Sequence, residues 1–564
     1  MLFGDQIPDA DAYVSKVLSR YPSLAALVPD ILRARASCAG FVECCAQAIY
    51  GDGSRVVGFT TTFHQTCASL AVARALKQTD ASRIVVFGGA NCEGEMGLQM
   101  IRSFPWLDYV CTQEGDLVFP ELLQRLLREG QAGAVPGFLK AGESTALTDA
   151  PLVSDMDALP VPNFHDYFAA LESSPVAGAV ERRVPVETSR GCWWGEKHQC
   201  TFCGLNGASM QFRSKSADRV LDELAHLCRT YDVTYIDCVD NILDLNYLRT
   251  LFPRISEVGR KVELFYETKA NLKYQQLVTL HEAGVRSIQP GLESLSNAVL
   301  RIMRKGCTGL QNIALLRWCA ELGIDVAWNI IFGFPGEPPA EYHGMARLLP
   351  LLVHLQPPAS CAPFRLDRFS PYFEEAEAFG LRRVRPASAA YYVFPFGRRV
   401  LEKLVYYFEY DRPDDPDPVE YTDALLAELA QWWTAYASPP EARPRLDLTR
   451  WGDQTMLLVD TRPCAVAREH CLEQVASQVY RLCDTPQSVS SLTRRVGGQV
   501  TESQVRQELE SLLNAKLMVE MEGQHLSLAV FRDRPPVSLS GEDTPDASLQ
   551  LQQAAPALLR SGPC

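Results

Sequence analysis

The 564-residue sequence lacks several features that would place it in a class at once. No apolar run approaches the roughly 20 residues that a membrane-spanning helix needs. The amino terminus, Met-Leu-Phe-Gly-Asp-Gln, shows neither the basic segment nor the apolar core of a secretory signal. No internal repeat is visible, and 54 Lys and Arg stand against 68 Asp and Glu, a net charge of -14. We therefore expect a cytoplasmic protein with no membrane partner and no nucleic-acid partner, because nucleic-acid binders present a basic face.

Cysteine, in contrast, is plentiful, with 18 residues. In a chain of this size the cysteines do not form a small disulfide scaffold, and without an export signal we expect free thiols. Hydrophobic residues make up 47% of the sequence and charged residues 22%, which is ordinary for a globular protein. The length predicts about three to four domains.

Three cysteines stand close together, namely Cys192, Cys200 and Cys203, and Gly-Leu-Asn follows them. Their spacing, Cys-x7-Cys-x2-Cys, suits a [4Fe–4S] cluster with one iron left without a protein ligand. Thiolate sulfur is the soft, anionic ligand that such clusters need. A structural zinc site would need a fourth ligand at similar spacing, for which His198 is the candidate. Three unrelated buried thiols are the remaining alternative.

The residues around these cysteines, Arg-Gly-Cys-Trp-Trp-Gly195 and Cys-Thr-Phe-Cys-Gly-Leu-Asn-Gly207, resemble the radical S-adenosylmethionine (SAM) superfamily. More narrowly, they resemble peptide-maturation radical SAM enzymes that carry an RGCWWG and CxFCGLNG signature. The x7 interval departs from the usual Cys-x3-Cys-x2-Cys of the superfamily and is a mark of this group. Residues 363–373, Pro-Phe-Arg-Leu-Asp-Arg-Phe-Ser-Pro-Tyr-Phe, are shared with the same group. The resemblance covers about residues 10–530 and implies a [4Fe–4S] cluster, SAM and an electron donor such as flavodoxin or ferredoxin.

The first 140 residues predict helices at 10–21 and 24–50 and then strands that alternate with helices. Short apolar runs at 55–62, 82–90 and 109–112 predict a parallel, doubly wound sheet, in which ligands bind at the carboxyl ends of the strands. The position before a radical SAM core resembles a cobalamin-binding domain. No Asp-x-His-x-x-Gly occurs, so the resemblance implies no protein His on cobalt, and we find no strand before residue 55, so the sheet is expected to be truncated. The implied cobalamin contacts are Thr60, Thr61, Thr62, Gly88, Gly89, Ala90, Asn91, Glu114, Gly115 and Asp116, although a tight turn alone also explains the Gly pair.

From residue 185, Val186 with the loop of the three cysteines is expected to form the first strand of a new sheet. Further strands at 234–240, 262–268, 285–293 and 325–334 alternate with helices and predict a partial TIM-type barrel. The site of such a barrel lies at the carboxyl ends of its strands. The resemblance implies that Phe202 lies near adenine, Asp237 and Asp240 contact the methionyl amine, and Glu267 binds a ribose hydroxyl. Packing, a solvated strand end and a surface ion pair are the respective alternatives. Gly291, Glu293 and Asn329 complete the implied SAM contacts at the ends of the last two strands.

Residues 451–531 predict a winged helix, with a strand at 455–460, helices at 471–483, 489–496 and 502–515, and a wing at 519–528. This unit resembles the PqqD-like element that captures leader peptides. We expect strand 455–460 to be an edge strand that a leader extends by β-augmentation, with pockets beside helix 502–515. Structural support of the barrel is the alternative. DNA binding is disfavoured because helix 502–515 carries three Glu and one Arg.

The expected organisation and function follow from these pieces. The predicted divisions are a cobalamin-type domain (1–140), a connector (141–184), the radical SAM barrel (185–375), a helical extension (376–450), the winged helix (451–531) and a disordered tail (532–564). The expected function is cobalamin-dependent C-methylation of a ribosomally made precursor peptide at an unactivated carbon. The alternatives are a radical SAM peptide maturase with a non-methylating reaction, such as cross-linking, cyclisation or epimerisation, and a non-catalytic peptide-binding or escort protein.

Overall fold

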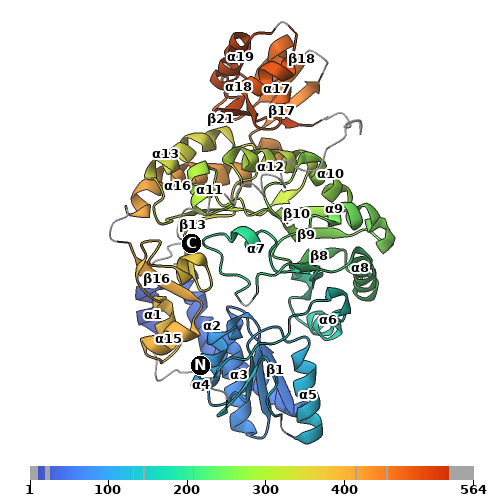
Figure 1. Ribbon diagram of the computed structural model, residues 1–564, viewed down its shortest axis with the longest axis vertical. Helices are drawn as coiled ribbons and strands as arrows, with labels where there is room; N and C mark the ends of the chain where they lie inside the picture. Colours follow the sequence, from blue (N-terminus) through green and yellow to red (C-terminus); the bar gives the residue numbers. More distant parts are fainter. Residues whose placement is uncertain are drawn as a thin grey trace. The chain divides into compact units, whose positions relative to one another are not determined.

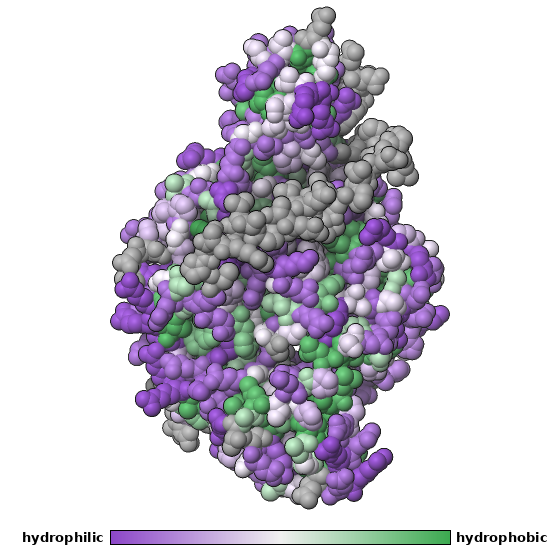
Figure 2. Space-filling view, in the orientation of Figure 1, coloured by the Kyte–Doolittle hydropathy of each residue, from purple (hydrophilic) through white to green (hydrophobic). Residues whose placement is uncertain are grey.

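The computed structural model, drawn in Figure 1, describes residues 10–18, 26–130, 132–143, 146–207, 209–412, 416–451, 455–498 and 500–532. Contacts divide the chain into two compact units. Unit 1 consists of Met1–Leu159, Phe202–Met210 and Arg365–Pro413, and unit 2 of Pro160–Thr201, Gln211–Phe364 and Asp414–Cys564. No described helix is long and apolar enough to cross a membrane, and the face drawn in Figure 2 mixes hydrophilic and apolar residues. The predicted tail falls almost entirely outside the described residues.

The sheet of unit 1 has four strands in the order β1-β2-β3-β4, of which the first three are parallel and the last is antiparallel to its neighbour. Strand β2 is apolar and buried on both faces, as strands of covered parallel sheets are. The strands alternate with helices, so the predicted α/β pattern is confirmed here. The elements are α1 (Ala10–Lys16), α2 (Val28–Gly51), β1 (Val56–Thr60), α3 (Gln65–Thr79), β2 (Ile84–Gly88), α4 (Glu95–Ser103), β3 (Tyr109–Cys111), α5 (Val118–Glu129) and β4 (Phe138–Lys140).

Helices cover both faces of this sheet. On one face Phe87 packs with Leu70 of α3, Met100 of α4 and Leu401 of α15 (Arg398–Leu404). On the other face α5 packs its buried Leu122 and Leu126 against β2 and β3. Two separate apolar cores therefore hold the sheet, which is the doubly covered arrangement that the sequence predicts.

Unit 1 also contains a small antiparallel sheet from the segment 365–413, with strand order β14-β16-β15. The helical extension expected at 376–450 is interrupted here, because α15 ends at Leu404 and the strand β16 follows. Pairing to β14 and β15 on both sides fixes that stretch as a strand. The elements are β14 (Leu366–Asp367), α14 (Pro371–Glu374), β15 (Arg382–Pro386), a 3-10 turn (Ser388–Tyr392) and β16 (Tyr407–Asp411).

Unit 2 contains a parallel sheet with strand order β11-β10-β9-β8-β5, and β12 and β13 form a second parallel pair. A bridge between Glu293 and Ile330 joins the two groups, and the described strands do not close into a barrel. The predicted strand 325–334 is divided at Ala327-Trp328, where the Trp328 ring is buried and donates to the Gln356 carbonyl. The strands are β5 (Arg183–Val186), β8 (Tyr235–Cys238), β9 (Glu263–Glu267), β10 (Val285–Gln289), β11 (Asp325–Val326), β12 (Asn329–Phe332) and β13 (Ser360–Pro363).

Helices separate the strands of this sheet, as the alternating pattern predicts, and every carboxyl end in a parallel sheet points to one edge. The buried stripe of α8, with Val220, Leu224 and Leu227, repeats at helical spacing. The helices and 3-10 segments are α8 (Ala217–Tyr231), α9 (Tyr247–Thr250), a 3-10 segment (Phe252–Val258), α10 (Tyr274–Glu282), α11 (Asn297–Ile302), α12 (Gly309–Leu322), α13 (Pro339–Leu348) and α16 (Pro418–Ala437).

The carboxyl-terminal part of unit 2 has the strand order β19-β18-β17-β23 and a smaller sheet β20-β22-β21. Our expectation that 455–460 forms an edge strand is wrong, because β18 pairs with β17 on one side and β19 on the other. Glu522 and Gly523, both with positive φ, make the tight turn of the predicted wing. The elements are β17 (Leu446–Trp451), β18 (Thr455–Asp460), β19 (Glu469–Glu473), α17 (Gln474–Leu482), β20 (Gln487–Ser488), α18 (Val489–Val496), α19 (Glu502–Asn514), β21 (Met518–Met521), β22 (Gln524–Ser527) and β23 (Val530–Phe531).

Buried polar contacts fix this part to the helices of the same unit. Arg317 of α12 is 0% exposed and donates to Ser527 Oγ at 2.9 Å and to Asp484 Oδ1 at 2.5 Å. Arg462 donates to the carbonyl of Leu351 at 2.7 Å. The winged region (451–531) is therefore packed on α12 and on the segment around Leu351 of the same unit.

Candidate active site

The loop between Cys192 and Cys200 lies in unit 2, after the short strand β6 (Ser189–Arg190). It contains one helical turn, α7 (Gly195–His198), and the Gly195 N–H donates to Cys192 Sγ at 3.3 Å. Both cysteines are half-buried, and burial is the first cause that raises the pKa of Cys192. The x7 interval thus forms a compact structured turn.

Two tryptophans fasten this loop to neighbouring strand-end loops. Trp193 Nε1 donates to the Leu243 carbonyl at 3.0 Å, and Trp194 Nε1 donates to the Arg304 carbonyl at 3.2 Å. A Cβ on Gly306 would overlap with the Trp194 ring. The Trp194 side chain, which is 9% exposed, is therefore packed inside the protein.

Lys269 lies among these groups and was missed by sequence reasoning. Its ammonium stands 3.5 Å from the centre of the Trp194 ring and also donates to the Lys305 carbonyl. Burial lowers the pKa of Lys269 to about 8, with the charge of Lys305 next, while Cys307, Cys200 and Cys192 oppose the shift. A buried cation within electrostatic reach of thiols suits an anionic iron–sulfur cluster. The one sequence feature that could have indicated Lys269 is its position two residues after Glu267, at the end of a predicted strand.

Asp240 lies at the expected strand end but serves the protein itself. It is 0% exposed and accepts from the N–H groups of Thr188 and Ser189 at 2.7 and 2.9 Å and from the Thr188 hydroxyl. Burial raises its pKa to about 6, and these hydrogen bonds oppose the shift. Its contacts therefore fix the backbone that leads to Cys192.

Asp237 is not gathered with Asp240. It pairs with Arg183 at 3.1 Å, with side chains 38% and 45% exposed, so the alternative of a solvated strand residue describes it better. Asn329 likewise accepts from the exposed Ser360 hydroxyl at 2.8 Å.

Glu267, Gly291 and Glu293 do come together with Lys305. Burial raises the pKa of Glu267 to about 7, followed by the charges of Asp240 and Glu293, and Lys305 opposes the shift. Glu293, at a φ of +59°, lies 3.9 Å from Lys305. Gly291 has a φ of +56°, and a Cβ there would approach Lys305 Nζ to 2.9 Å. The strand ends thus carry a half-buried carboxylate pair beside one ammonium.

Phe202 and Cys203 belong to unit 1, where both are half-buried. The described residues contain no group of three or more His, Cys, Asp and Glu side chains that could hold a metal ion. Cys192 and Cys200 belong to unit 2, so neither unit alone carries the set of three thiols. The donor chemistry, with three thiols and a buried ammonium beside two of them, nevertheless fits a [4Fe–4S] cluster.

The carboxyl edge of the unit 1 sheet has some groups engaged by the protein and others open. Thr61 is 0% exposed, and its hydroxyl donates to the Gly88 carbonyl. Gly89 has a φ of +93°, and a Cβ added there would lie only 2.6 Å from the backbone oxygen of Thr61. The tight-turn alternative therefore explains Gly89. Glu114 accepts from the Val153 N–H at 2.8 Å. Thr60, Thr62 and Ala90 are exposed, and Gly88 and Gly115 are half-buried, whereas the Asn91 side chain donates to the Phe63 carbonyl at 3.1 Å and to the Thr66 hydroxyl. These accessible small residues fit a bulky planar ligand, whereas Thr61 serves the fold.

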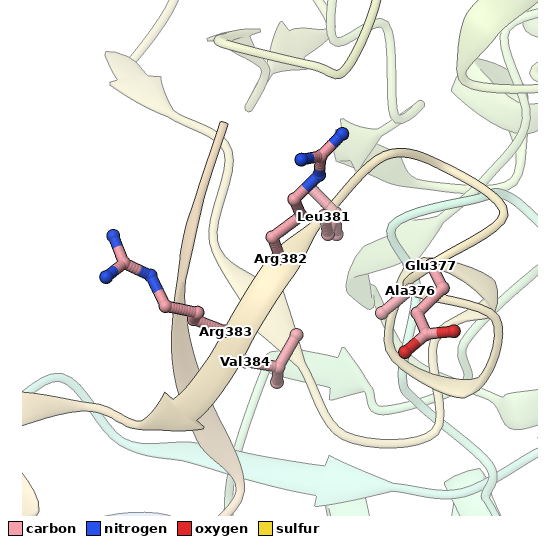
Figure 3. A pocket seen from close by; sticks show the side chains of 6 residues that line it. All are labelled: Ala376, Glu377, Leu381, Arg382, Arg383 and Val384. Carbon is pink, nitrogen blue, oxygen red and sulfur yellow. The ribbon is translucent and has the colours of Figure 1, made fainter. Parts of the chain in front are cut away.

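A pocket of about 610 Å³ lies elsewhere in unit 1. Figure 3 draws the side chains that line it. Its lining residues are Ala376, Glu377, Leu381, Arg382, Arg383 and Val384, and none of them is a predicted site residue. We therefore assign it no part in the candidate active site.

Residues 186–349 match the Radical SAM superfamily, a span that holds β8, β9, β10, β11 and β12 and the loops that follow them. Among curated relatives, the chain is 28% identical over 294 residues to an uncharacterized methyltransferase of Pyrococcus horikoshii, covering 50% of this chain and 61% of that protein. It is 26% identical over 263 residues to 4'-phospho-dehydrooxetanocin synthase of Priestia megaterium (42% and 33% covered) and 26% identical over 235 residues to hopanoid C-3 methylase of Methylococcus capsulatus (40% and 42%). The matches span less than two thirds of each of these relatives.

Solved structures extend the likeness across both units. OxsB, a cobalamin-dependent radical SAM enzyme solved with aqua-cobalamin and SAM, matches with a TM-score of 0.52 at 17% identity, over 71% of this chain and 63% of that one. TsrM of Kitasatospora setae, a radical SAM methyltransferase solved with tryptophan and a SAM analogue, matches with a TM-score of 0.51 at 17% identity, over 71% and 81%. TsrM has also been solved with cobalamin and a [4Fe–4S] cluster. At this identity the likeness establishes the fold.

Proposed function

We propose that this chain is a cobalamin-dependent radical SAM enzyme that methylates an unactivated carbon of a ribosomally made precursor peptide. The observation that carries the proposal is the Cys-x7-Cys-x2-Cys motif, of which Cys192 and Cys200 lie in the unit whose strand ends carry Glu267 and Lys269, in a chain that also has a doubly covered Rossmann-like sheet. The structural likeness to OxsB and TsrM supports the same combination of cofactors.

The cofactors supply the difficult chemistry: a cluster with SAM provides a carbon radical that takes hydrogen from an unactivated carbon, and cobalamin provides a methyl group. The chain's residues hold and orient these groups. Cys192, Cys200 and Cys203 would ligate the cluster. Lys269 would offset the negative charge of the cluster thiolates. Glu267, half-buried at a strand end, would accept a hydrogen bond from a ribose hydroxyl.

Cobalamin would lie against the accessible residues of the unit 1 edge. Thr60, Gly88 and Gly115 present short side chains or none there, while the predicted contact Asn91 is bonded to Phe63 and Thr66. With no Asp-x-His-x-x-Gly in the sequence, we propose that no protein His binds cobalt. An absorption spectrum typical of His-ligated cobalt would contradict this part of the proposal.

The open edge of β19 supports a peptide substrate. Among the described strands, β19 pairs only with β18. One row of its backbone groups is therefore free to pair with an added strand. The Asp460 N–H donates to the Arg468 carbonyl, and ladder bonds in an antiparallel pair alternate. The N–H groups of Glu469 and Cys471 then point to the open edge. We propose that the leader of the precursor adds there by β-augmentation.

A proline substitution tests this docking edge. Cys471→Pro removes one outward N–H but no ladder bond, whereas Cys471→Ala keeps that N–H and is the matched control. We expect Cys471→Pro to weaken precursor binding at least tenfold, measured by fluorescence anisotropy with a labelled leader. SAM cleavage without peptide should stay unchanged. Equal binding by the two variants would remove β19 from the proposal.

The reaction itself is tested by anaerobic incubation of reconstituted enzyme with SAM, a reductant, cobalamin and the precursor encoded nearest to this gene. We expect the peptide mass to rise by CH2, because a methyl group replaces a hydrogen, and we expect no such rise with Cys200→Ala. A mass loss of two hydrogens, or an unchanged mass with inverted stereochemistry, would instead establish a non-methylating maturase. This second candidate is favoured by the unit 1 sheet, whose described order β1-β2-β3-β4 has no reversal of the kind that creates a ligand crevice. A wild-type enzyme that binds peptide but neither takes up a cluster nor cleaves SAM would indicate the escort protein.

A further inference from the structure

The two glycines that follow Cys203 have no room for a side chain. Neither Gly204 nor Gly207 has a positive φ, so their backbone conformation is open to other residues. A Cβ on Gly204 would overlap with the carbonyl oxygen of Arg368, and one on Gly207 would overlap with the Phe369 ring. Space is therefore what requires glycine here, and the segment 365–413 of the same unit occupies it.

Arg368 and Phe369 are themselves held firmly. Arg368 is 4% exposed, and its guanidinium donates to the Val405 carbonyl at 2.9 Å and to the Glu402 carbonyl. The backbone N–H of Arg368 donates to the Tyr406 carbonyl at 2.9 Å. Phe369 has a φ of +67°, which bulky residues rarely adopt, so the surrounding contacts must impose it. Such a conformation indicates a position that the fold specifies closely.

Aromatic contacts extend from Phe369 to the carboxyl edge of the unit 1 sheet. The Phe369 and Tyr406 ring centres are 6.3 Å apart, and Tyr406 lies 5.3 Å from Phe63, three residues after the end of β1. The pKa of Tyr406 is raised by burial first, then by Asp367 and then by Cys203, which places the thiol within its electrostatic reach. The loop after Cys203 thus rests on a continuous packed row of rings.

We propose that Phe369 is a positioning residue for Cys203. Its ring, with the Arg368 carbonyl and Tyr406, fixes the Cys203–Gly207 loop on unit 1 and so sets the place of the third sulfur. This inference rests on the proposed function, because a fixed third sulfur matters only if the three cysteines ligate a cluster. It assigns the Arg-Leu-Asp-Arg-Phe stretch to support of the cluster motif.

Four single variants and one double variant test the proposal in the full chain. Phe369→Ala removes the ring, and Phe379→Ala, which loses a ring contact to Tyr372 in the same segment, is its control. Gly207→Ala introduces the overlap, and Gly397→Ala, with nothing within 4 Å of its added Cβ, is its control. In the apo protein we expect Cys203 alkylation, measured by mass spectrometry relative to Cys192, to rise at least fivefold in Phe369→Ala and Gly207→Ala. After reconstitution, iron per chain should fall by half or more and the EPR spectrum of the reduced cluster should change.

The double variant separates positioning from general damage. Once the Phe369 ring is absent, Gly207→Ala no longer meets it, so the two effects on alkylation should combine to less than their product. Unchanged Cys203 alkylation and an unchanged EPR spectrum in both single variants, as in their controls, would overturn the inference. If the wild-type enzyme takes up no cluster, the proposed function fails, while the alkylation comparison still decides whether Phe369 fixes the loop.

Discussion

Replacement of Arg317 by Met should loosen the winged region of unit 2. The Arg317 side chain is 0% exposed, and its charged partner Asp484 is 19% exposed. Removing one member of a buried pair costs about 3–5 kcal/mol, and partial hydration of Asp484 favours the lower end. Trp318 Nε1 still donates to Asp484 at 3.4 Å, which offsets part of the loss. We therefore expect about 3 kcal/mol, or roughly a 150-fold increase in the population of the locally opened state.

Thermolysin cleavage under native conditions measures this opening, since its rate follows the opened population when closing is fast. Arg301→Met is the matched control, because Arg301 joins the same two parts through Glu522 with side chains 65% and 57% exposed. Such a surface pair contributes about 0–1 kcal/mol. Equal cleavage rates for the two variants would refute the view that the buried guanidinium holds the winged region in place.

Three further predictions concern the strand-end site. Gly306→Ala should displace Trp194 and lower iron uptake on reconstitution, whereas Gly323→Ala, with a similar φ of +69° but nothing near its Cβ, should cost only backbone strain of about 1–2 kcal/mol in thermal unfolding. Because the pKa of Glu267 is raised, the folded protein keeps a proton that the unfolded chain loses between pH 4.5 and about 7. The free energy of unfolding should therefore fall as pH rises through that window, by at most about 3 kcal/mol. In urea unfolding at several pH values, Glu267→Gln should show a smaller fall than the wild type. Asp240→Ala should destabilise the protein by about 2–3 kcal/mol, because the buried N–H groups of Thr188 and Ser189 then lose the carboxylate oxygen that accepts from both; an undiminished melting temperature would contradict the role given to Asp240.

The sequence predicted the strand-end residues best where a strand is short, apolar and bounded by polar residues. Residues 234–240 and 262–268 correspond to β8 and β9 to within two residues at each end. Strands that depend on their partners were missed. The sequence around Cys471 reads as the start of a helix, yet pairing with β18 makes it β19, and this pairing removes β18 from the edge.

The sequence indicated which residue types form the site better than it indicated which contacts they make. Glu267 and Glu293 lie together as expected, because strand ends in one parallel sheet share an edge. The roles of Asp240 and Asp237 depend on which hydrogen-bond donors face them in the folded chain. Lys269 belongs to the site because it packs on the ring of Trp194, which is distant in sequence. The overlap of Gly207 with Phe369 likewise arises only from tertiary packing.

Isotope transfer from labelled SAM tests the central claim most directly. The reconstituted wild-type enzyme is incubated anaerobically with methyl-d3 SAM, reductant and precursor, with and without added cobalamin. The account predicts a peptide that gains a d3-methyl group only when cobalamin is present, together with 5'-deoxyadenosine. Formation of 5'-deoxyadenosine with no label in the peptide, in the presence of bound cobalamin, would contradict it.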